Sequence, residues 1–98
     1  MEKGTPHCKL TVVRALVRAG QVRTTQSARE GAVGLGLDFD AMVTVLLGLA
    51  PSDFFKSMTT HDNHRIWQDV YRPVIPAGKL YLKLTVIHDV LVVSFKEL

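Results

Sequence analysis

The C-terminal stretch decides the fold. Residues 79–98 read KLYLKLTVIHDVLVVSFKEL, and apolar and polar side chains alternate before and after His88 and Asp89. A period of two is what a half-buried β-strand requires, because successive side chains point to opposite faces of a sheet. The stretch therefore predicts two antiparallel strands that are joined by a tight turn at His88 and Asp89.

A two-residue turn fixes which residues face each other. We expect a core face with three apolar pairs, which are Val86–Leu91, Leu84–Val93 and Leu82–Phe95. We expect the other face to hold Thr85–Val92, Lys83–Ser94 and Tyr81–Lys96. A slip of one residue would pair core residues with polar ones, so the pattern favours this register. It puts the phenol of Tyr81 beside the ammonium of Lys96, either as an exposed pair that stabilises the sheet or as part of a site.

Length and composition bound the function classes. The 98 residues suffice for one domain, residues 1–98, and the 47% hydrophobic and 21% charged contents exclude a disordered chain. The net charge of +3 favours a polyanionic or acidic partner, but only weakly. Cys8 has no second cysteine to pair with, which fits a reducing compartment. The start has no apolar signal core, and the apolar run at residues 41–50 is too short to cross a bilayer, so we expect a soluble cytoplasmic protein.

The first half of the chain predicts three helices. The first is expected to open at Thr5 and Pro6, since threonine caps helices and proline is pre-organised for the first helical position, and to stop at Gly20. Its apolar stripe consists of Leu10, Val13, Leu16 and Val17. Residues 21–25 then form either a short edge strand or a linker.

The second and third helices are predicted from their caps. The second begins at Thr25 or at Ser27, where the spacing Ser27–Glu30 is that of a capping box, and its end is indicated by Gly34 and Gly36.

The third helix is capped by Asp38 or Asp40 and ended by Pro51. It is apolar nearly all round, so we expect it to be a buried helix that lies across the sheet.

From Phe54 onward the period changes to two. Residues 54–60 and 66–72 are predicted strands, with a turn at residues 61–64 and a Pro- and Gly-rich loop before the last hairpin. Helices followed by an antiparallel meander indicate an α+β fold, an antiparallel sheet with helices packed on one face. The other face is then partly open. Lys56 and Gln68 are expected to point to it, with Lys56 opposite either Gln68 or Asp69.

Other motifs leave alternatives open. His61 and His64 have a spacing that a metal ion can use, but no Cys or Glu partner stands at a matching distance in the sequence. Trp67 is either a packing residue or a platform for a nucleobase. We find no phosphate-binding glycine loop, no Ser-His-Asp order and no paired cysteines, and we expect no cofactor.

Longer stretches carry a resemblance to a known family. FFKSMTTHDNHRIWQDVYRP and YLKLTVIHDVLVVSFKE, together with TPH, AGQVRTT and LGLDFD, resemble the MqsR family of motility quorum-sensing regulator toxins. The resemblance covers nearly the whole chain. It departs most between Glu30 and Gly36, where extra glycines fall in the second helix and raise the question of how an antitoxin fits.

The resemblance implies a function. Members are toxins of type II toxin–antitoxin pairs, with a RelE-like bacterial ribonuclease fold, and they cut mRNA at GCU-type triplets without the ribosome. A zinc-containing, DNA-binding antitoxin neutralises them, so mRNA and the antitoxin are the implied partners, DNA is contacted only through the antitoxin, and no membrane is involved. The implied catalytic positions are Lys56, Gln68, Tyr81 and Lys96.

These residue types suit metal-independent RNA cleavage by the RNA's own 2′-hydroxyl. Lysines hold the phosphate, stabilise growing negative charge and, with a lowered pKa, shuttle a proton. Tyr81 donates a proton or stacks on a base, and Gln68 orients the sugar or phosphate. Which residue is acid and which is base stays open. Two alternatives are a non-catalytic regulator that binds nucleic acid or an antitoxin-like partner, and a metal hydrolase that uses His61 and His64.

Overall fold

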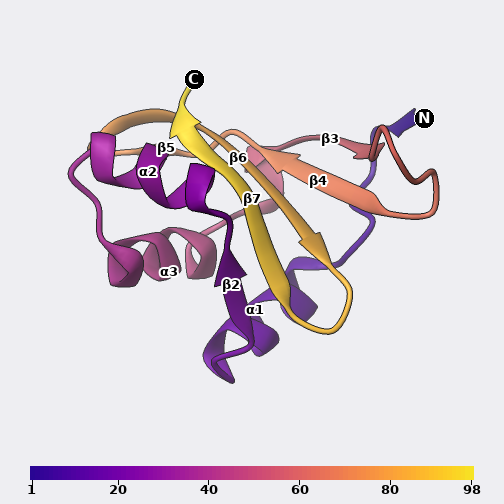
Figure 1. Ribbon diagram of the computed structural model, residues 1–98, viewed down its shortest axis with the longest axis horizontal. Coiled ribbons are helices and arrows are strands. Elements are labelled where there is room, and N and C mark those ends of the chain that lie inside the picture. Colours follow the sequence, from indigo (N-terminus) through magenta and orange to yellow (C-terminus); the bar gives the residue numbers. More distant parts are fainter.

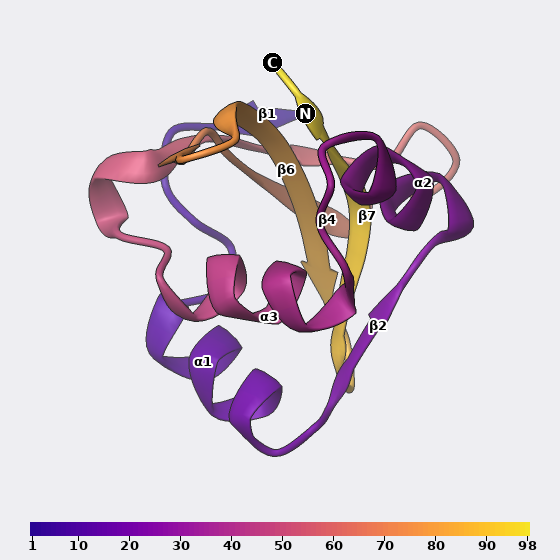
Figure 2. The ribbon, with the colours of Figure 1, turned by 90° about the vertical axis from the view of Figure 1, so that its left-hand side faces the viewer.

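The computed structural model describes residues 1–98, and three helices lie on one side of a seven-stranded sheet (Figures 1 and 2). The elements are β1 (Glu2–Lys3), α1 (Leu10–Arg18), β2 (Val22–Thr24), α2 (Gln26–Gly34), α3 (Phe39–Leu47), the 3-10 turn η1 (Pro51–Asp53), β3 (Phe54–Thr59), β4 (Trp67–Tyr71), β5 (Val74–Ile75), β6 (Gly78–Val86) and β7 (Val90–Glu97). The strand order is β1-β3-β4-β6-β7-β2, with β5 paired to β6. The predicted α+β class and the antiparallel meander β3-β4-β6-β7 are confirmed.

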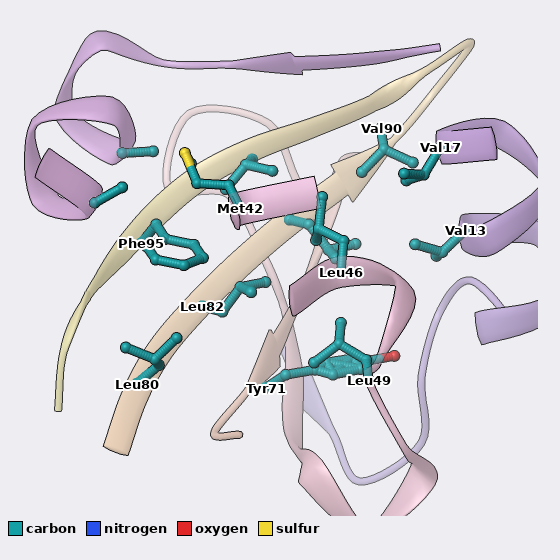
Figure 3. Close-up of a cluster of buried hydrophobic side chains, with 14 residues drawn as sticks. Val13, Val17, Met42, Leu46, Leu49, Tyr71, Leu80, Leu82, Val90 and Phe95 are labelled. Atoms are coloured by element: carbon teal, nitrogen blue, oxygen red, sulfur yellow. The ribbon is translucent and has the colours of Figure 1, made fainter. Parts of the chain in front are cut away.

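The core lies between the helices and one face of the sheet (Figure 3). Each helix contributes a pair of buried residues, which are Val13 and Val17, Ala28 and Ala32, and Met42 and Leu46. They pack with strand residues that include Leu82 and Phe95. Burial of one such aliphatic or aromatic side chain contributes roughly 1.5–3 kcal/mol, so this layer stabilises the sheet on which the open residues lie. Figure 2 shows α3 lying across β6 and β7, as predicted. The helix is not buried all round, however, because only Met42 and Leu46 are buried while Asp40 and Thr44 are exposed.

The register of the C-terminal hairpin differs from prediction near its turn. Pairs Tyr81–Lys96, Leu82–Phe95 and Lys83–Ser94 are confirmed, but Leu84 faces Val92, Thr85 faces Leu91 and Val86 faces Val90. Val93 is therefore an extra residue, a β-bulge, and the loop has three residues instead of two. The predicted pairs Val86–Leu91, Leu84–Val93 and Thr85–Val92 are wrong. Residues 90–93 read VLVV, so alternation gives no information at the very place where the bulge moves the buried positions to Val90 and Val92.

The start of the first helix was also predicted wrongly. Helix α1 begins at Leu10, and the segment with Thr5 and Pro6 runs outside it. The carboxylate of Asp69, only 2% exposed, accepts hydrogen bonds from the backbone N–H groups of His7 and Cys8, each at 3.0 Å. A buried carboxylate needs such donors, so β4 holds this segment in place and delays the helix.

The second helix begins at Thr25, one of the two predicted caps. Its hydroxyl accepts from the backbone N–H of Ala28 at 3.1 Å and donates to the carbonyl of Val93 at 3.0 Å, so the cap also ties α2 to the bulge. The alternative capping box at Ser27 is wrong. Gly31 sits where an added Cβ would lie 1.9 Å from the carbonyl oxygen of Phe95, so glycine is what lets α2 approach β7. Helix α2 ends at Gly34, as its glycines indicated.

The remaining predictions are confirmed or corrected by small shifts. Asp38 caps α3 by accepting from the N–H of Ala41 at 2.8 Å, but the helix ends at Leu47 before Pro51, which instead opens η1. The stretch 21–25 contains the edge strand β2, which runs parallel to β7. None of the helices has the length and apolar character needed to span a membrane.

Candidate functional site

The sheet face that points away from the helices is the open face. Residues opposite each other on neighbouring antiparallel strands share a face, and one row of such partners is Lys56, Val70, Lys83 and Ser94, on β3, β4, β6 and β7. Val70 has no exposed surface, yet it does not belong to the core cluster. Its neighbours on the open face must therefore cover it. Lys56 and Lys83 are its direct partners in the sheet, and lysine stems can cover apolar surface while their ammonium groups reach toward water.

Tyr81 and Lys96 lie in the next row of the open face, two residues along the strands from Lys83 and Ser94. They are directly opposite each other on β6 and β7, and the Lys96 Nζ is 5.5 Å from the centre of the Tyr81 ring. That is within the range of a cation–π contact. Tyr81 is half-buried and Lys96 is exposed, so the strand fixes the ring while the ammonium stays accessible to a ligand.

We call the row that contains Lys56 and Lys83 the lysine row. Gln68 lies on one side of this row, and Tyr81 and Lys96 lie on the other. It faces Met58, and the predicted pairing of Lys56 with Gln68 or Asp69 is wrong because Lys56 faces Val70. The connection between β3 and β4 sets this register, because it spans residues 60–66 and is longer than the predicted turn at residues 61–64.

The four predicted residues therefore share one face without forming one tight cluster. Gln68 and Tyr81 are two rows apart, which corresponds to roughly 13 Å along the strands. A ligand that contacts both must be an extended one.

Lys56 carries an internal counter-ion. Its Nζ lies 2.7 Å from Oε1 of Glu2 on the neighbouring strand β1. The hydrogen bond from Lys56 and its positive charge lower the pKa of Glu2 below its usual value. The two side chains are 31% and 61% exposed, and ion pairs in water contribute little, so an incoming phosphate can replace the Glu2 carboxylate.

Three open-face residues were not among the predicted site residues. Lys83 stands in the centre of the lysine row, half-buried between Val70 and Ser94. Phe55 is 42% exposed, and the Arg72 guanidinium carbon lies 3.5 Å from its ring centre. The hairpin pattern had placed Lys83 on this face, but nothing in the alternation showed Phe55 there, because its position depends on the irregularity in β3. With Lys56 and Lys96, the open face carries four cations, and Glu2 is paired with one of them.

The alternative roles considered for Trp67 and for the histidine pair find little support. Trp67 lies on the helix side of the sheet, stacked on His7 at 5.5 Å between ring centres, with the Lys3 Nζ 4.1 Å from its own ring centre. This arrangement is packing of the N-terminal segment. His61 and His64 are both exposed in a loop, and no three His, Cys, Asp or Glu side chains gather as metal ligands do.

The thiol of Cys8 is not prepared for nucleophilic work. Burial and the nearby charge of Asp69 raise the pKa of Cys8 above its ordinary value, so the thiol stays protonated at neutral pH. Burial likewise raises the pKa of Tyr71, whose hydroxyl is enclosed without a hydrogen-bond partner. Neither the thiol of Cys8 nor the hydroxyl of Tyr71 is therefore prepared to react at neutral pH.

A small α+β chain with a helix-backed sheet and a cationic, aromatic-bearing open face defines a class of protein that is suited to an extended polyanion. The family model described as "Motility quorum-sensing regulator, toxin of MqsA" matches residues 5–97. The mRNA interferase toxin MqsR of Escherichia coli (strain K12) is 65% identical over 97 residues, which is 99% of each chain. This chain belongs to the motility quorum-sensing regulator toxin family, and the family predicted from the sequence is confirmed.

Proposed function

We propose that this protein is the toxin of a type II toxin–antitoxin pair and acts as a ribosome-independent endoribonuclease that cuts mRNA. The family and the name of the 65% identical relative support this activity. The observation that carries it in the structure is the row of lysines beside the Tyr81–Lys96 pair on a sheet face that no helix covers. Along the length of this face, positive charges and hydrogen-bond donors are available to an RNA backbone.

The proposed reaction uses a nucleophile that RNA itself supplies. The 2′-hydroxyl oxygen attacks the adjacent phosphorus as its proton leaves to a base, and the bond from phosphorus to the 5′-oxygen breaks as that oxygen takes up a proton. The products are a 2′,3′-cyclic phosphate and a 5′-hydroxyl end. Lys56 and Lys96 stabilise the negative charge that grows on the phosphoryl oxygens, which is the term that usually contributes most to such catalysis.

Tyr81 and Gln68 receive different roles because they lie apart. Tyr81 adjoins Lys96, so its hydroxyl is placed either to give a proton to the departing oxygen or to hold a phosphate, while its ring can stack on a base. Gln68, two rows away, contacts the sugar or phosphate of a neighbouring nucleotide and orients the strand. Lys83 lies between them and neutralises the phosphate that spans the gap.

The partner in the cell is a cognate antitoxin. We infer a zinc-containing, DNA-binding protein, through which this toxin reaches DNA indirectly, and GCU-type triplets as cleavage sites, both on the strength of the family resemblance. The substrate places the protein in the cytoplasm. An adjacent open reading frame with paired cysteines and a helix-turn-helix pattern would support this pairing, and a genomic neighbourhood without one would count against it.

One experiment separates an enzyme from a binder. The purified chain is incubated with an end-labelled mRNA of known sequence, and the fragments are sized on a gel. An endoribonuclease gives discrete bands that grow with time and end in cyclic phosphates. A non-catalytic regulator shifts the RNA on a native gel but leaves it whole, and that result would reject the proposal.

A further inference from the structure

Phe55 lies on the open face because the pairing of its strand is irregular at this position. The pairing of β3 with β4 shifts register between Phe54 and Lys56, which makes Phe55 an extra residue in the ladder. Phe54 keeps its place against the core, where its ring meets Tyr71 edge-on at 5.5 Å between centres. Phe55 instead remains 42% exposed, beside the lysine row. A large aromatic ring that the fold re-aims toward water is available for a ligand.

Arg72 forms a second layer on this ring. Its guanidinium carbon lies 3.5 Å from the ring centre of Phe55, which is a van der Waals stack, and the Lys56 Nζ is 5.5 Å from the same centre. The Arg72 backbone N–H donates to the carbonyl of Asp53 at 2.7 Å, which fixes the residue just after β4. The two ion pairs of the molecule involve other cations, Arg23 and Lys56, so the Arg72 guanidinium has no carboxylate partner.

The stack lies next to the residues proposed for the reaction. Tyr71 faces Leu82 on β6, so the next position along, Arg72, falls in the row of Tyr81 and Lys96. Two aromatic rings, each with a cation over it, therefore lie across the same end of the open face. Unpaired bases in RNA stack on aromatic rings and on guanidinium planes, and nearby cations bind the backbone between them.

We propose that Phe55 and Arg72 form a stacking site for one unpaired nucleobase of the RNA, adjacent to the nucleotide whose phosphate meets Tyr81 and Lys96. This inference rests on the proposed function, because it states how the same face holds its substrate. The base extends the Phe55–Arg72 stack, and the free guanidinium donors hold the phosphate that follows. The site accounts for an exposed phenylalanine that contributes nothing to the core.

Two substitutions test the stack without changing the charge of the face. Arg72→Lys keeps the positive charge but removes the planar guanidinium group. Phe55→Leu keeps an apolar side chain but removes the aromatic ring. The matched control is Arg29→Lys, because Arg29 lies 5.1 Å over the ring of Phe39 in the helix layer. The probe is a short, fully 2′-O-methylated RNA, which has no nucleophile and stays intact, labelled for fluorescence anisotropy and carrying 2-aminopurine as a stacking reporter.

We expect both open-face variants to bind this RNA about tenfold more weakly, since stacking on one side chain contributes a factor of this order. The slope of affinity against salt should not change, because no cation is removed. Wild type and Arg29→Lys should quench the 2-aminopurine emission, and the other two variants should not. In cleavage assays, KM should rise more than kcat falls, as for a contact that holds substrate and transition state alike.

The outcomes distinguish this inference from the proposed function. If the wild-type chain cuts no RNA, the endoribonuclease proposal fails, while the methylated probe still reports on stacking. If the wild type cuts RNA and both folded variants bind the probe as tightly as it does, the stacking site is refuted. A thermal melt shows whether Phe55→Leu folds. If it does not, the binding measured with Arg72→Lys decides whether the stacking site exists, because Arg72 is exposed and its substitution should not unfold the protein.

Discussion

At Tyr81 and Lys96, substitutions should lower RNA cleavage while hardly changing the stability of the fold. Tyr81→Phe removes only a hydroxyl, and Lys96→Ala removes an exposed side chain together with its charge, so each should change stability by about 1 kcal/mol or less. Both should lower the cleavage rate, and the double variant should lose less than the product of the two single losses, because the pair acts as one unit. Cleavage kinetics and thermal melts of the same preparations measure both effects.

The control for this pair lies on the other face of the same strand. Leu82 is fully buried beside Phe95, so Leu82→Ala leaves a cavity and should cost roughly 2–5 kcal/mol, with activity lost through unfolding. Full activity in a folded Lys96→Ala protein would exclude the pair from the site.

Glu2 is expected to restrain the enzyme. Glu2→Gln removes the carboxylate that holds Lys56, so RNA affinity should rise about twofold to fivefold, the range of an exposed ion pair. Glu97→Gln makes the same charge change at an exposed residue on β7, opposite Leu80, and should give a smaller gain. Equal gains for the two variants, measured by anisotropy, would mean that only net charge matters.

The pH dependence of this restraint follows from the lowered pKa of Glu2. A lowered pKa means that the ion pair is fully formed above the ordinary carboxylate range and is lost as the pH falls through the lowered value. The difference between wild type and Glu2→Gln should therefore be constant near neutral pH. It should disappear only in acid below the normal pKa of glutamate.

At the scale of elements, the contact between α2 and β7 makes two glycines behave oppositely. An added Cβ at Gly31 meets the carbonyl oxygen of Phe95 at 1.9 Å, whereas at Gly34 it meets nothing within 4 Å. Gly31→Ala should push the helix off the strand and destabilise the fold by about 1–3 kcal/mol, as overpacking does. Gly34→Ala should leave stability unchanged or raise it by up to about 1 kcal/mol, since alanine favours helices. Urea unfolding measures both, and a Gly31→Ala protein as stable as wild type would contradict this packing.

The elements also show what the sequence can and cannot predict. Thr25, Asp38 and the strands were predictable because caps and period-two alternation act locally. The start of α1 was not, because Asp69, more than sixty residues away, holds the preceding backbone. The bulge at Val93 was hidden in an all-apolar run, although Tyr81 and Lys96 beyond it kept their predicted register. The site followed the same division: alternation placed Tyr81, Lys83 and Lys96, whereas the stack on Phe55 depends on a pairing irregularity that no local pattern records.

For the whole molecule, the open face itself supplies the positive charge that a metal ion provides in other nucleases. In the proposed reaction Lys56, Lys83 and Lys96 bind the phosphates, so cleavage should proceed at an unchanged rate in EDTA. It should weaken steeply with rising salt, because the same lysines displace counter-ions from RNA. Cleavage that EDTA abolishes and a divalent ion restores would overturn the lysine-based reaction.

The parallel pairing of β2 with β7 has a consequence for how a cell makes this toxin. Val22 pairs with Val90, and the Thr25 cap of α2 binds Val93, so β2 and α2 cannot take their native positions until the last strand has been synthesised. That strand also carries Lys96. An unfinished chain on the ribosome therefore lacks both the strand that pairs with β2 and β6 and one residue of the proposed site, so we expect it to cut no RNA before its synthesis is complete.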